Sequence, residues 1–228
     1  MNDHAELTLS CDGDERRVSV GDLVVAGWTG RDKAAMEAHI VELEELGVPR
    51  PHTTPIFYRV AASLLTTAEE IQVPGGESSG EVEPVILALD DGLWVGVGSD
   101  HTDRQAETMG ITLAKQLCAK PLGSALWRFD EVAPHWDSLI LRSYAEDDDG
   151  RRLYQEGPAA TMLPPTELML RYLGEGKALA PGTAMYCGTL AVIGGIKPAP
   201  GFEIELEDPV MGRKISHRYT VKSLPVEG

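Results

Sequence analysis

Short strand-like runs dominate this chain, and helices do not separate them one by one. After residue 55 these runs cover 56–60, 81–89, 93–99, 138–144, 183–189, 202–207 and 215–222. A doubly wound α/β fold needs strands and helices to alternate regularly, and this order does not provide that alternation. We therefore expect a mixed, mostly β architecture of the α+β class.

The N-terminal segment predicts a hairpin, a buried strand and a helix. Residues 6–10 and 16–20 alternate apolar and polar side chains on either side of the turn-rich Cys11-Asp12-Gly13-Asp14. Residues 23–28 form an apolar run typical of a buried strand. Asp32 can cap a helix that ends at Gly47, before Pro49. This helix places three apolar side chains on one side, namely Met36, Ile40 and Leu43.

Two further helices are expected among the later strands. Asp103 can cap one that runs to Ala119 and stops before Pro121. Pro164-Pro165 opens the other, which ends at Gly174. The acidic run 146–149 is typical of a solvated hairpin tip.

Composition bounds the domain count and the class of partner. The chain has 228 residues, of which 43% are hydrophobic, so one domain can bury a core without disulfides or a structural metal. It carries 20 Lys+Arg against 36 Asp+Glu, a net charge of −16. Nucleic acid and anionic membrane surfaces both require clustered positive charge, so we expect neither as a partner.

The short apolar runs, the polar N-terminus and the scattered cysteines predict a cytoplasmic protein. The longest apolar runs, 23–28 and 190–196, are far shorter than the roughly 20 residues of a membrane-spanning helix. The polar, acidic N-terminus does not resemble a secretory signal. Three scattered cysteines, Cys11, Cys118 and Cys187, favour reduced thiols over a disulfide framework.

Three carboxylates are the first candidate for chemistry. Glu81 and Glu83 lie two residues apart on a strand, so both project to the same face. Asp100 follows the next strand. Three converging oxygen ligands suit a hard divalent cation such as Mg²⁺ or Mn²⁺. The alternative is a solvated acidic pair on an exposed strand face, and spacing alone does not decide between them.

Eight short motifs in order resemble those of the fumarylacetoacetate hydrolase superfamily, and most closely a branch of it known as a domain of unknown function. The resemblance covers the chain from about Gly27 to the C-terminus. The motifs read here as Gly27-Trp28-Thr29-Gly30-Arg31-Asp32, Pro55-Ile56-Phe57-Tyr58-Arg59, Glu81-Val82-Glu83, Asp100, Arg104-Gln105, Ala114-Lys115-Gln116-Leu117, Gly188-Thr189 and Pro200-Gly201-Phe202-Glu203-Ile204-Glu205.

The resemblance implies roles for several residues. Glu81, Glu83 and Asp100 would be the metal ligands. Lys115 would face the substrate and stabilise negative charge, although a solvent-facing helix lysine is the simpler alternative. The resemblance also implies substrate-binding groups, for which ordinary helix-surface or strand roles remain open, namely Arg104, Gln105 and Thr189.

The superfamily activates water with a His and a Glu on a helix, and this chain departs from that pattern. Lys33 stands where the His is expected. His39 and Glu42 follow six residues later on the same predicted helix, where side chains at i and i+3 are neighbours. We expect them to be the catalytic dyad, with a surface ion pair as the alternative.

The resemblance therefore implies a metal-dependent hydrolase that cleaves a carbon–carbon bond in an acylpyruvate-like 1,3-dicarbonyl or 2-oxo acid through a metal-stabilised enolate. A decarboxylase, hydratase or isomerase using the same site is the first alternative. A non-catalytic module that binds a small acid is the second.

It also implies a mixed β-roll with flanking helices and a homodimer. Residues 1–25 would form a hairpin appendage and 26–228 the catalytic domain.

Overall fold

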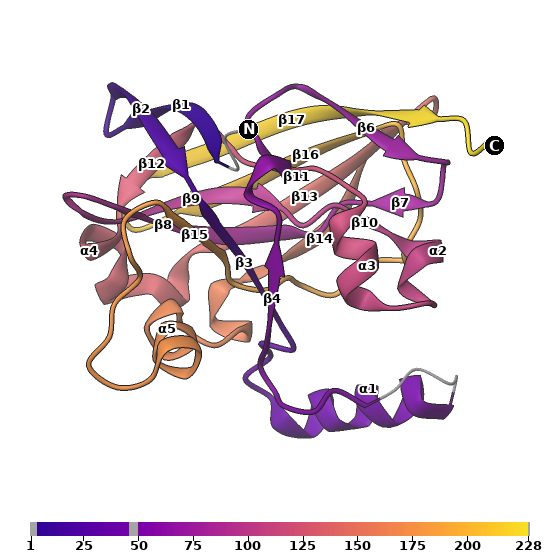
Figure 1. The fold of residues 1–228 in the computed structure, drawn as a ribbon, viewed down its shortest axis with the longest axis horizontal. Coiled ribbons are helices and arrows are strands. Elements are labelled where there is room, and N and C mark those ends of the chain that lie inside the picture. Colours follow the sequence, from indigo (N-terminus) through magenta and orange to yellow (C-terminus); the bar gives the residue numbers. More distant parts are fainter. Residues whose placement is uncertain (1–3, 46–49, 228) are drawn as a thin grey trace.

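Two packed β-sheets form the body of the computed structural model, which describes residues 4–45 and 50–227 (Figure 1). The larger sheet has eight strands, in the spatial order β2 (Asp14–Val20), β1 (Ala5–Cys11), β12 (Ala125–Arg128), β9 (Gly92–Ser99), β8 (Val82–Leu89), β15 (Thr183–Tyr186), β3 (Asp22–Gly27) and β4 (Ile56–Val60). The predicted hairpin at 6–20 and the strand at 23–28 are confirmed. The hairpin joins the sheet through parallel pairing of β1 with β12.

The smaller sheet has five strands. Their spatial order is β14 (Gly150–Pro158), β13 (Ile140–Asp147), β16 (Gly201–Asp208), β17 (Arg213–Leu224) and β6 (Glu70–Pro74). The acidic run lies at the β13–β14 hairpin tip, as predicted. In β13, Leu141, Ser143 and Ala145 are buried and alternate with half-exposed neighbours, which is the pattern of a sheet with one face on the core.

The core occupies both faces of the larger sheet, and this explains the continuous apolar composition of its central strands. In β8 every residue from Val82 to Ala88 is buried. One face packs on the smaller sheet through residues such as Ile86 and Leu206. The other lies under the curled N-terminal strands, where Leu87 contacts the cluster that contains Leu9. A strand covered on both faces has no reason to alternate polar and apolar residues.

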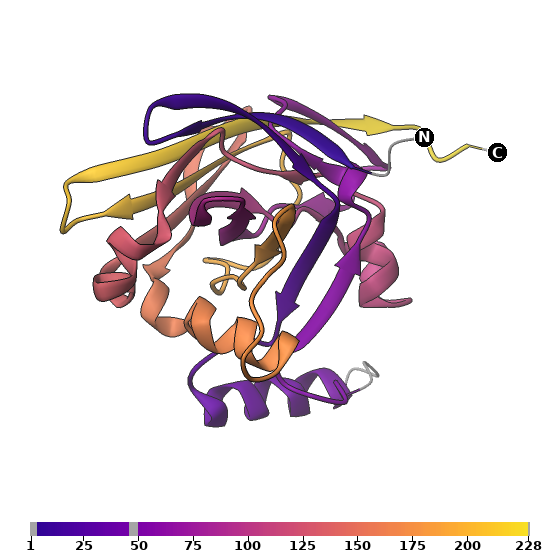
Figure 2. The same ribbon diagram turned by 60° about the vertical axis from the view of Figure 1, so that its left-hand side comes forward.

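Helices are short and lie around the sheets. They are α1 (Lys33–Glu45), α2 (Arg104–Glu107), α3 (Ile111–Gln116), α4 (Phe129–Val132) and α5 (Pro165–Leu173), with 3₁₀ turns η1 (Ala62–Leu64), η2 (Ala133–Ser138) and η3 (Ala159–Thr161). Figures 1 and 2 show α1 at the margin, outside the strands. As predicted, Asp32 caps α1: its Oδ1 accepts hydrogen bonds from the N–H groups of Ala34 and Ala35, both 3.0 Å. The predicted stop at Gly47 and Pro49 lies outside the described residues.

The helix predicted from Asp103 to Ala119 is wrong as a single element. Asp103 does cap α2, with a 2.8 Å hydrogen bond from Ala106 N–H to its Oδ1. The helix then ends, because Gly110 adopts an extended φ of 162°. The chain restarts as α3. This break turns the C-terminal half of the segment toward the carboxylates described below.

Two strand predictions needed correction. The strand predicted at 183–189 ends at Tyr186, because Gly188 has a φ of +99° that no strand accommodates. The strand predicted from 138 begins at Ile140, since Ser138 ends η2 and donates its hydroxyl to His135 O. Both corrections concern ends of elements.

The three cysteines are free, as expected from their number and spacing, and the structure buries all of them. Across the described residues, no helix is both long and apolar enough to cross a membrane.

Candidate active site

Antiparallel pairing of β8 with β9 brings the three predicted carboxylates together. Glu83 pairs with Gly98, and just beyond the ladder Asp100 N–H donates to Glu81 O at 2.9 Å. One side-chain oxygen from each of Glu81, Glu83 and Asp100 lies within 4.8 Å of the others. The sequence predicted that the two glutamates share a face. The turn and the strand register add Asp100 to them.

Glu83 is held in place by the loop after β15. It is only 2% exposed, and its Oε2 accepts a 2.7 Å hydrogen bond from Gly188 N–H. Burial, with the nearby charge of Asp100, raises the pKa of Glu83 well above its usual 4.5. Gly188 cannot be replaced without movement, because a Cβ there would lie 1.8 Å from Thr29 Oγ1.

Two buried lysines flank Asp100, one on each carboxylate oxygen. Lys115, on α3, pairs with Oδ2 and also lies 3.9 Å from Glu81 Oε2. Lys120 lies in the two-residue strand β11 (Lys120–Pro121), which pairs with β5 (Leu65–Thr66), and its Nζ is 3.1 Å from Oδ1. Burial alone would raise the pKa of Asp100, but the two ammonium groups outweigh it and hold this pKa far below its usual value.

Arg104 joins the cluster at its outer edge. Its Nη2 lies 3.0 Å from Glu81 Oε1, and its Nη1 lies 3.0 Å from Glu107 Oε2. Its Nε donates to Ser79 Oγ at 2.7 Å; Ser79 belongs to β7 (Ser78–Ser79), which pairs with β10 (Thr102–Asp103). The guanidinium thus orients Glu81. Gln105 is exposed and lines a surface hollow with Arg104 and Glu77.

Thr189 is close to the carboxylates but its hydroxyl is engaged with the protein. Its Oγ1 donates to Val82 O at 2.9 Å and accepts from Gln155 Nε2 at 2.9 Å. Gln155 Oε1 in turn accepts from Val82 N–H at 2.9 Å. Thr189 and Gln155 therefore fix the main chain between the two glutamates, and a role of Thr189 in substrate binding stays a prediction.

His39 and Glu42 lie in α1, but their side chains fall outside the part of the chain that the structure describes. The assignment of these two residues as a catalytic dyad therefore stays a prediction.

Sequence reasoning missed two buried polar residues around the cluster, namely Lys120 and Gln155. A third, His101, follows Asp100 in the chain, where the sequence offers it as a residue that could contact water on the metal. The ring of His101 lies between Tyr219 OH, 3.1 Å from Nδ1, and Ser78 Oγ, 2.9 Å from Nε2. Burial and the charge of Lys120 lower the pKa of His101 to about 3, so the ring is neutral. The sequence signal for these residues is slight, since each is polar within an otherwise ordinary segment.

The residues present fit a hard divalent cation. The donors are carboxylate oxygens, the preferred ligands of Mg²⁺ and Mn²⁺. Lys115 and Lys120 pair with Asp100, Arg104 pairs with Glu81, and Glu83 accepts its hydrogen bond from Gly188 N–H. Glu81 and Arg104 are the more exposed members, with 17% and 13% of their side chains accessible, and they form the open side.

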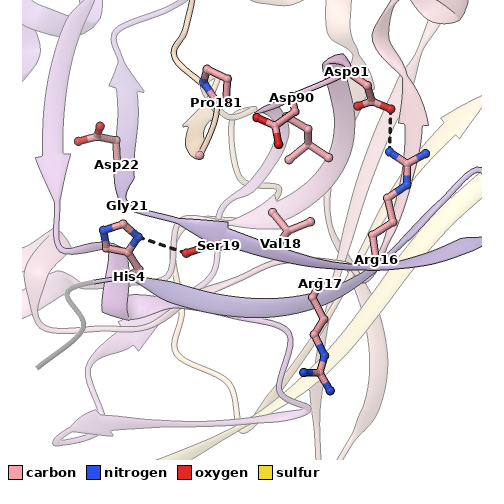
Figure 3. A pocket seen from close by; sticks show the side chains of 12 residues that line it. His4, Arg16, Arg17, Val18, Ser19, Gly21, Asp22, Asp90, Asp91 and Pro181 are labelled. Atoms are coloured by element: carbon pink, nitrogen blue, oxygen red, sulfur yellow. Dashed lines mark hydrogen bonds and ion pairs between the residues drawn. The ribbon is translucent and has the colours of Figure 1, made fainter.

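A larger hollow of about 680 Å³ lies elsewhere, beside the β1–β2 hairpin (Figure 3). Two contacts join its lining residues: Arg16 pairs with Asp91 at 2.7 Å, and the His4 ring lies 3.2 Å from Ser19 Oγ. Arg17 extends from the opposite side of the strand (Figure 3). None of the three clustered carboxylates lines this hollow.

Comparison with known proteins supplies a family and a fold. The model of a family described as "Protein of unknown function (DUF2848)" matches residues 26–219. No curated protein matches the sequence.

Solved structures of several proteins resemble the chain along almost its whole length. A protein from Oleispira antarctica, described as a candidate fumarylacetoacetate isomerase/hydrolase, is 21% identical, with a TM-score of 0.66 over 94% of this chain and 99% of its own. A candidate fumarylpyruvate hydrolase from Burkholderia cenocepacia is 19% identical, with a TM-score of 0.65 and coverage of 96% and 92%. Fumarylpyruvate hydrolase from Pseudomonas aeruginosa, solved with Mn²⁺ and pyruvate, is 17% identical, with a TM-score of 0.63 and 97% coverage of both chains. At these identities the likeness shows a common fold.

Proposed function

Since the chain belongs to the DUF2848 family and has the fold of the fumarylacetoacetate hydrolase superfamily, we propose that it is a divalent-metal-dependent hydrolase that cleaves a carbon–carbon bond in a small 1,3-dicarbonyl or 2-oxo acid. The observation that carries the proposal is the convergence of Glu81, Glu83 and Asp100 beside Lys115. An acylpyruvate is the substrate class we expect.

Glu81, Glu83 and Asp100 would hold the cation, for which Mg²⁺ and Mn²⁺ are the candidates. A bound divalent cation supplies Lewis-acid polarisation of the substrate carbonyl. Support for this assignment comes from the Pseudomonas aeruginosa structure, which contains Mn²⁺ together with pyruvate, a 2-oxo acid. The three carboxylates offer the oxygen donors that both ions require.

Lys115 would stabilise the negative charge that develops as the bond next to the carbonyl breaks. Its ammonium lies at the open side of the carboxylates, next to Glu81 as well as Asp100. A cation fixed in a water-poor site interacts strongly with developing charge, because it needs no reorganisation during the reaction. The aromatic ring of Tyr58 lies beside this ammonium, with 5.6 Å between Nζ and the ring centroid, in a cation–π contact.

Arg104 would assist indirectly. It is buried on most sides and paired with Glu81 and Glu107, so it orients Glu81 for the cation. Gln105, which is exposed beside it, is better placed to reach a substrate carboxylate. Hydrolysis additionally needs a base for water, and we assign this role to His39 with Glu42 as its partner.

A lyase or isomerase reaction in the same site is the second candidate. The observation that favours it is Lys33, which stands where the superfamily pattern places the water-activating His. Without activation of water, the same metal site would support decarboxylation or isomerisation; a hydratase reaction would need another group to deliver water.

The test is calorimetric titration of metal-stripped protein with Mn²⁺ and Mg²⁺, alone and with oxalate as a planar dianion that mimics an enolised oxo acid. We expect oxalate to bind only when the metal is present. Glu83→Gln should weaken Mn²⁺ binding by about a hundredfold, as loss of a metal ligand or its support commonly does. The matched control is Glu205→Gln, which removes a buried glutamate that pairs with Lys214. Equal Mn²⁺ affinity in both variants would overturn the ligand assignment.

A further inference from the structure

Lys120 is a second lysine on the candidate metal ligand Asp100, and the proposed chemistry does not use it. Its side chain is fully buried. The Nζ lies 3.1 Å from Asp100 Oδ1 and donates a 2.6 Å hydrogen bond to the main-chain oxygen of His101. One ammonium group therefore ties the side chain of Asp100 to the main chain of the next residue.

The two lysines occupy different sides of Asp100. Lys115 pairs with Oδ2 and lies 3.9 Å from Glu81, so it is on the side that the carboxylates share. Lys120, on β11, pairs with Oδ1. The main chain of β11 is itself held by Tyr186, whose OH donates to Lys120 O at 3.2 Å and to Pro121 O at 2.9 Å. Lys115 sits on a short helix segment near the open side, whereas Lys120 is enclosed.

We propose that Lys120 is a positioning residue that reserves Oδ1 of Asp100, so that this carboxylate presents to the cation only Oδ2, the oxygen that Lys115 contacts in the metal-free protein, and only part of its negative charge. This inference rests on the proposed metal-dependent function. Hydrogen bonds to a ligating carboxylate tune the metal as well as orienting the ligand. An ammonium group fixed behind the ligand lowers the affinity of the protein for the cation. It also leaves the bound cation more positive toward an anionic oxo acid.

A purely structural role predicts something different. If the Lys120–Asp100 pair only stabilised the fold, removing the lysine would loosen the ligands and weaken the binding of metal and acid together. Charge tuning instead predicts that the two affinities move in opposite directions. The directions in which the metal and acid affinities change therefore distinguish a structural role of Lys120 from charge tuning, and no activity measurement is needed.

The experiment uses Lys120→Gln in the full chain, because a glutamine amide can still donate a hydrogen bond to His101 O but carries no charge. Mn²⁺ affinity is measured from the electron paramagnetic resonance signal of free Mn²⁺, and oxalate affinity by titration of the Mn²⁺-loaded protein. We expect Mn²⁺ to bind at least about tenfold more tightly and oxalate at least about tenfold more weakly, because a full charge is lost close to both. Lys214→Gln, which removes a partly exposed lysine on β17, should change neither affinity more than about twofold.

Weakening of both affinities, or no change in either, overturns the inference. If the unaltered protein binds no Mn²⁺, the proposed metal-dependent function fails as well. Failure of the Lys120 inference alone is therefore distinguished by an unaltered protein that still binds Mn²⁺.

Should Lys120→Gln not fold, nuclear magnetic resonance of the unaltered protein provides the second measurement. The coupling across the hydrogen bond between Lys120 ¹⁵Nζ and Asp100 ¹³Cγ should persist when Mg²⁺ is added. Its disappearance on addition of Mg²⁺ would show that Oδ1 is not reserved.

Discussion

The main-chain N–H of Gly188 donates a 2.7 Å hydrogen bond to Oε2 of Glu83, joining the loop after β15 to the centre of the carboxylate cluster. The two residues are 105 positions apart in the chain. Gly188 reaches Glu83 because its φ of +99° turns the chain immediately after β15, next to β8. Burial removes water from the Glu83 carboxylate, and this contact orients the carboxylate and supplies a hydrogen bond in place of water.

Replacing Gly188 with Ala should destabilise the protein more than the same change at another glycine with positive φ. The new Cβ would lie 1.8 Å from Thr29 Oγ1, so the loop must move away from Glu83. Gly150→Ala is the matched control, because its φ is +108° and no atom lies within 4 Å of the added Cβ. Chemical unfolding should show a loss of about 1 kcal/mol for Gly150→Ala and at least about 2 kcal/mol more for Gly188→Ala. Equal losses would mean that the contact with Thr29 relaxes freely.

The stability of the metal-free protein should depend on the protonation of Glu83. Its folded-state pKa is raised above the usual 4.5, so the protonated form contributes stability that is lost as pH rises from 4.5 through the folded-state value. Glu83→Gln removes this loss, since the amide stays neutral. Urea unfolding of both proteins across this pH range should show the variant gaining stability relative to the unaltered chain as pH rises. Parallel curves would place Glu83 in an ordinary solvated environment.

Lys115→Met should destabilise the metal-free protein and make it respond more strongly to a divalent cation. Removing one partner of a buried ion pair costs about 3–5 kcal/mol, because Asp100 and Glu81 keep their charges. Mn²⁺ should raise the melting temperature of Lys115→Met more than that of the unaltered protein. For comparison, Lys214→Met removes a lysine that is 49% exposed and should cost no more than about 1 kcal/mol. A Lys115→Met protein as stable as this control would contradict the pairing.

Asp208 should protect the protein against acid. Burial alone would raise the pKa of Asp208, but hydrogen bonds from Met211 N–H, His135 and Arg213 outweigh it and hold the pKa below 3.8. The ionised form therefore contributes stability above pH 3.8 that is lost as pH falls through the folded-state pKa. Asp208→Asn should cost about 1–3 kcal/mol at neutral pH. This difference should shrink in acid, as measured by unfolding at both pH values; a constant difference would assign the effect to packing.

His39→Asn distinguishes hydrolysis from the lyase alternative. If His39 activates water, the variant should lose about a hundredfold or more in acylpyruvate hydrolysis, the usual range for a general base. Decarboxylation of oxaloacetate, which needs no activated water, should be much less affected. Chromatographic analysis of the products from both substrates makes the comparison. Unchanged hydrolysis in His39→Asn would exclude the dyad assignment.

Local sequence patterns predicted the elements that contacts between nearby residues define, and they missed the strands β6 and β12. The hairpin, the Asp32 cap and the helix at Pro165 follow from alternation, capping chemistry and proline placement. The helix at 103–119 was predicted too long, because the extended Gly110 interrupts it. Ends of elements depend on such single contacts, which periodicity does not record.

The sequence by itself determined that Glu81 and Glu83 share one face of a strand, because side chains alternate with a period of two along any strand. A turn of a few residues then makes Asp100 their neighbour. Lys115, Lys120, Gln155 and Gly188 come from separate elements, and only the tertiary structure decided that they meet around these carboxylates. The physical reason is that burial of both faces of the larger sheet and closure of the smaller sheet over it determine which distant segments come into contact. That choice is made by packing across the whole chain, and no local pattern contains it.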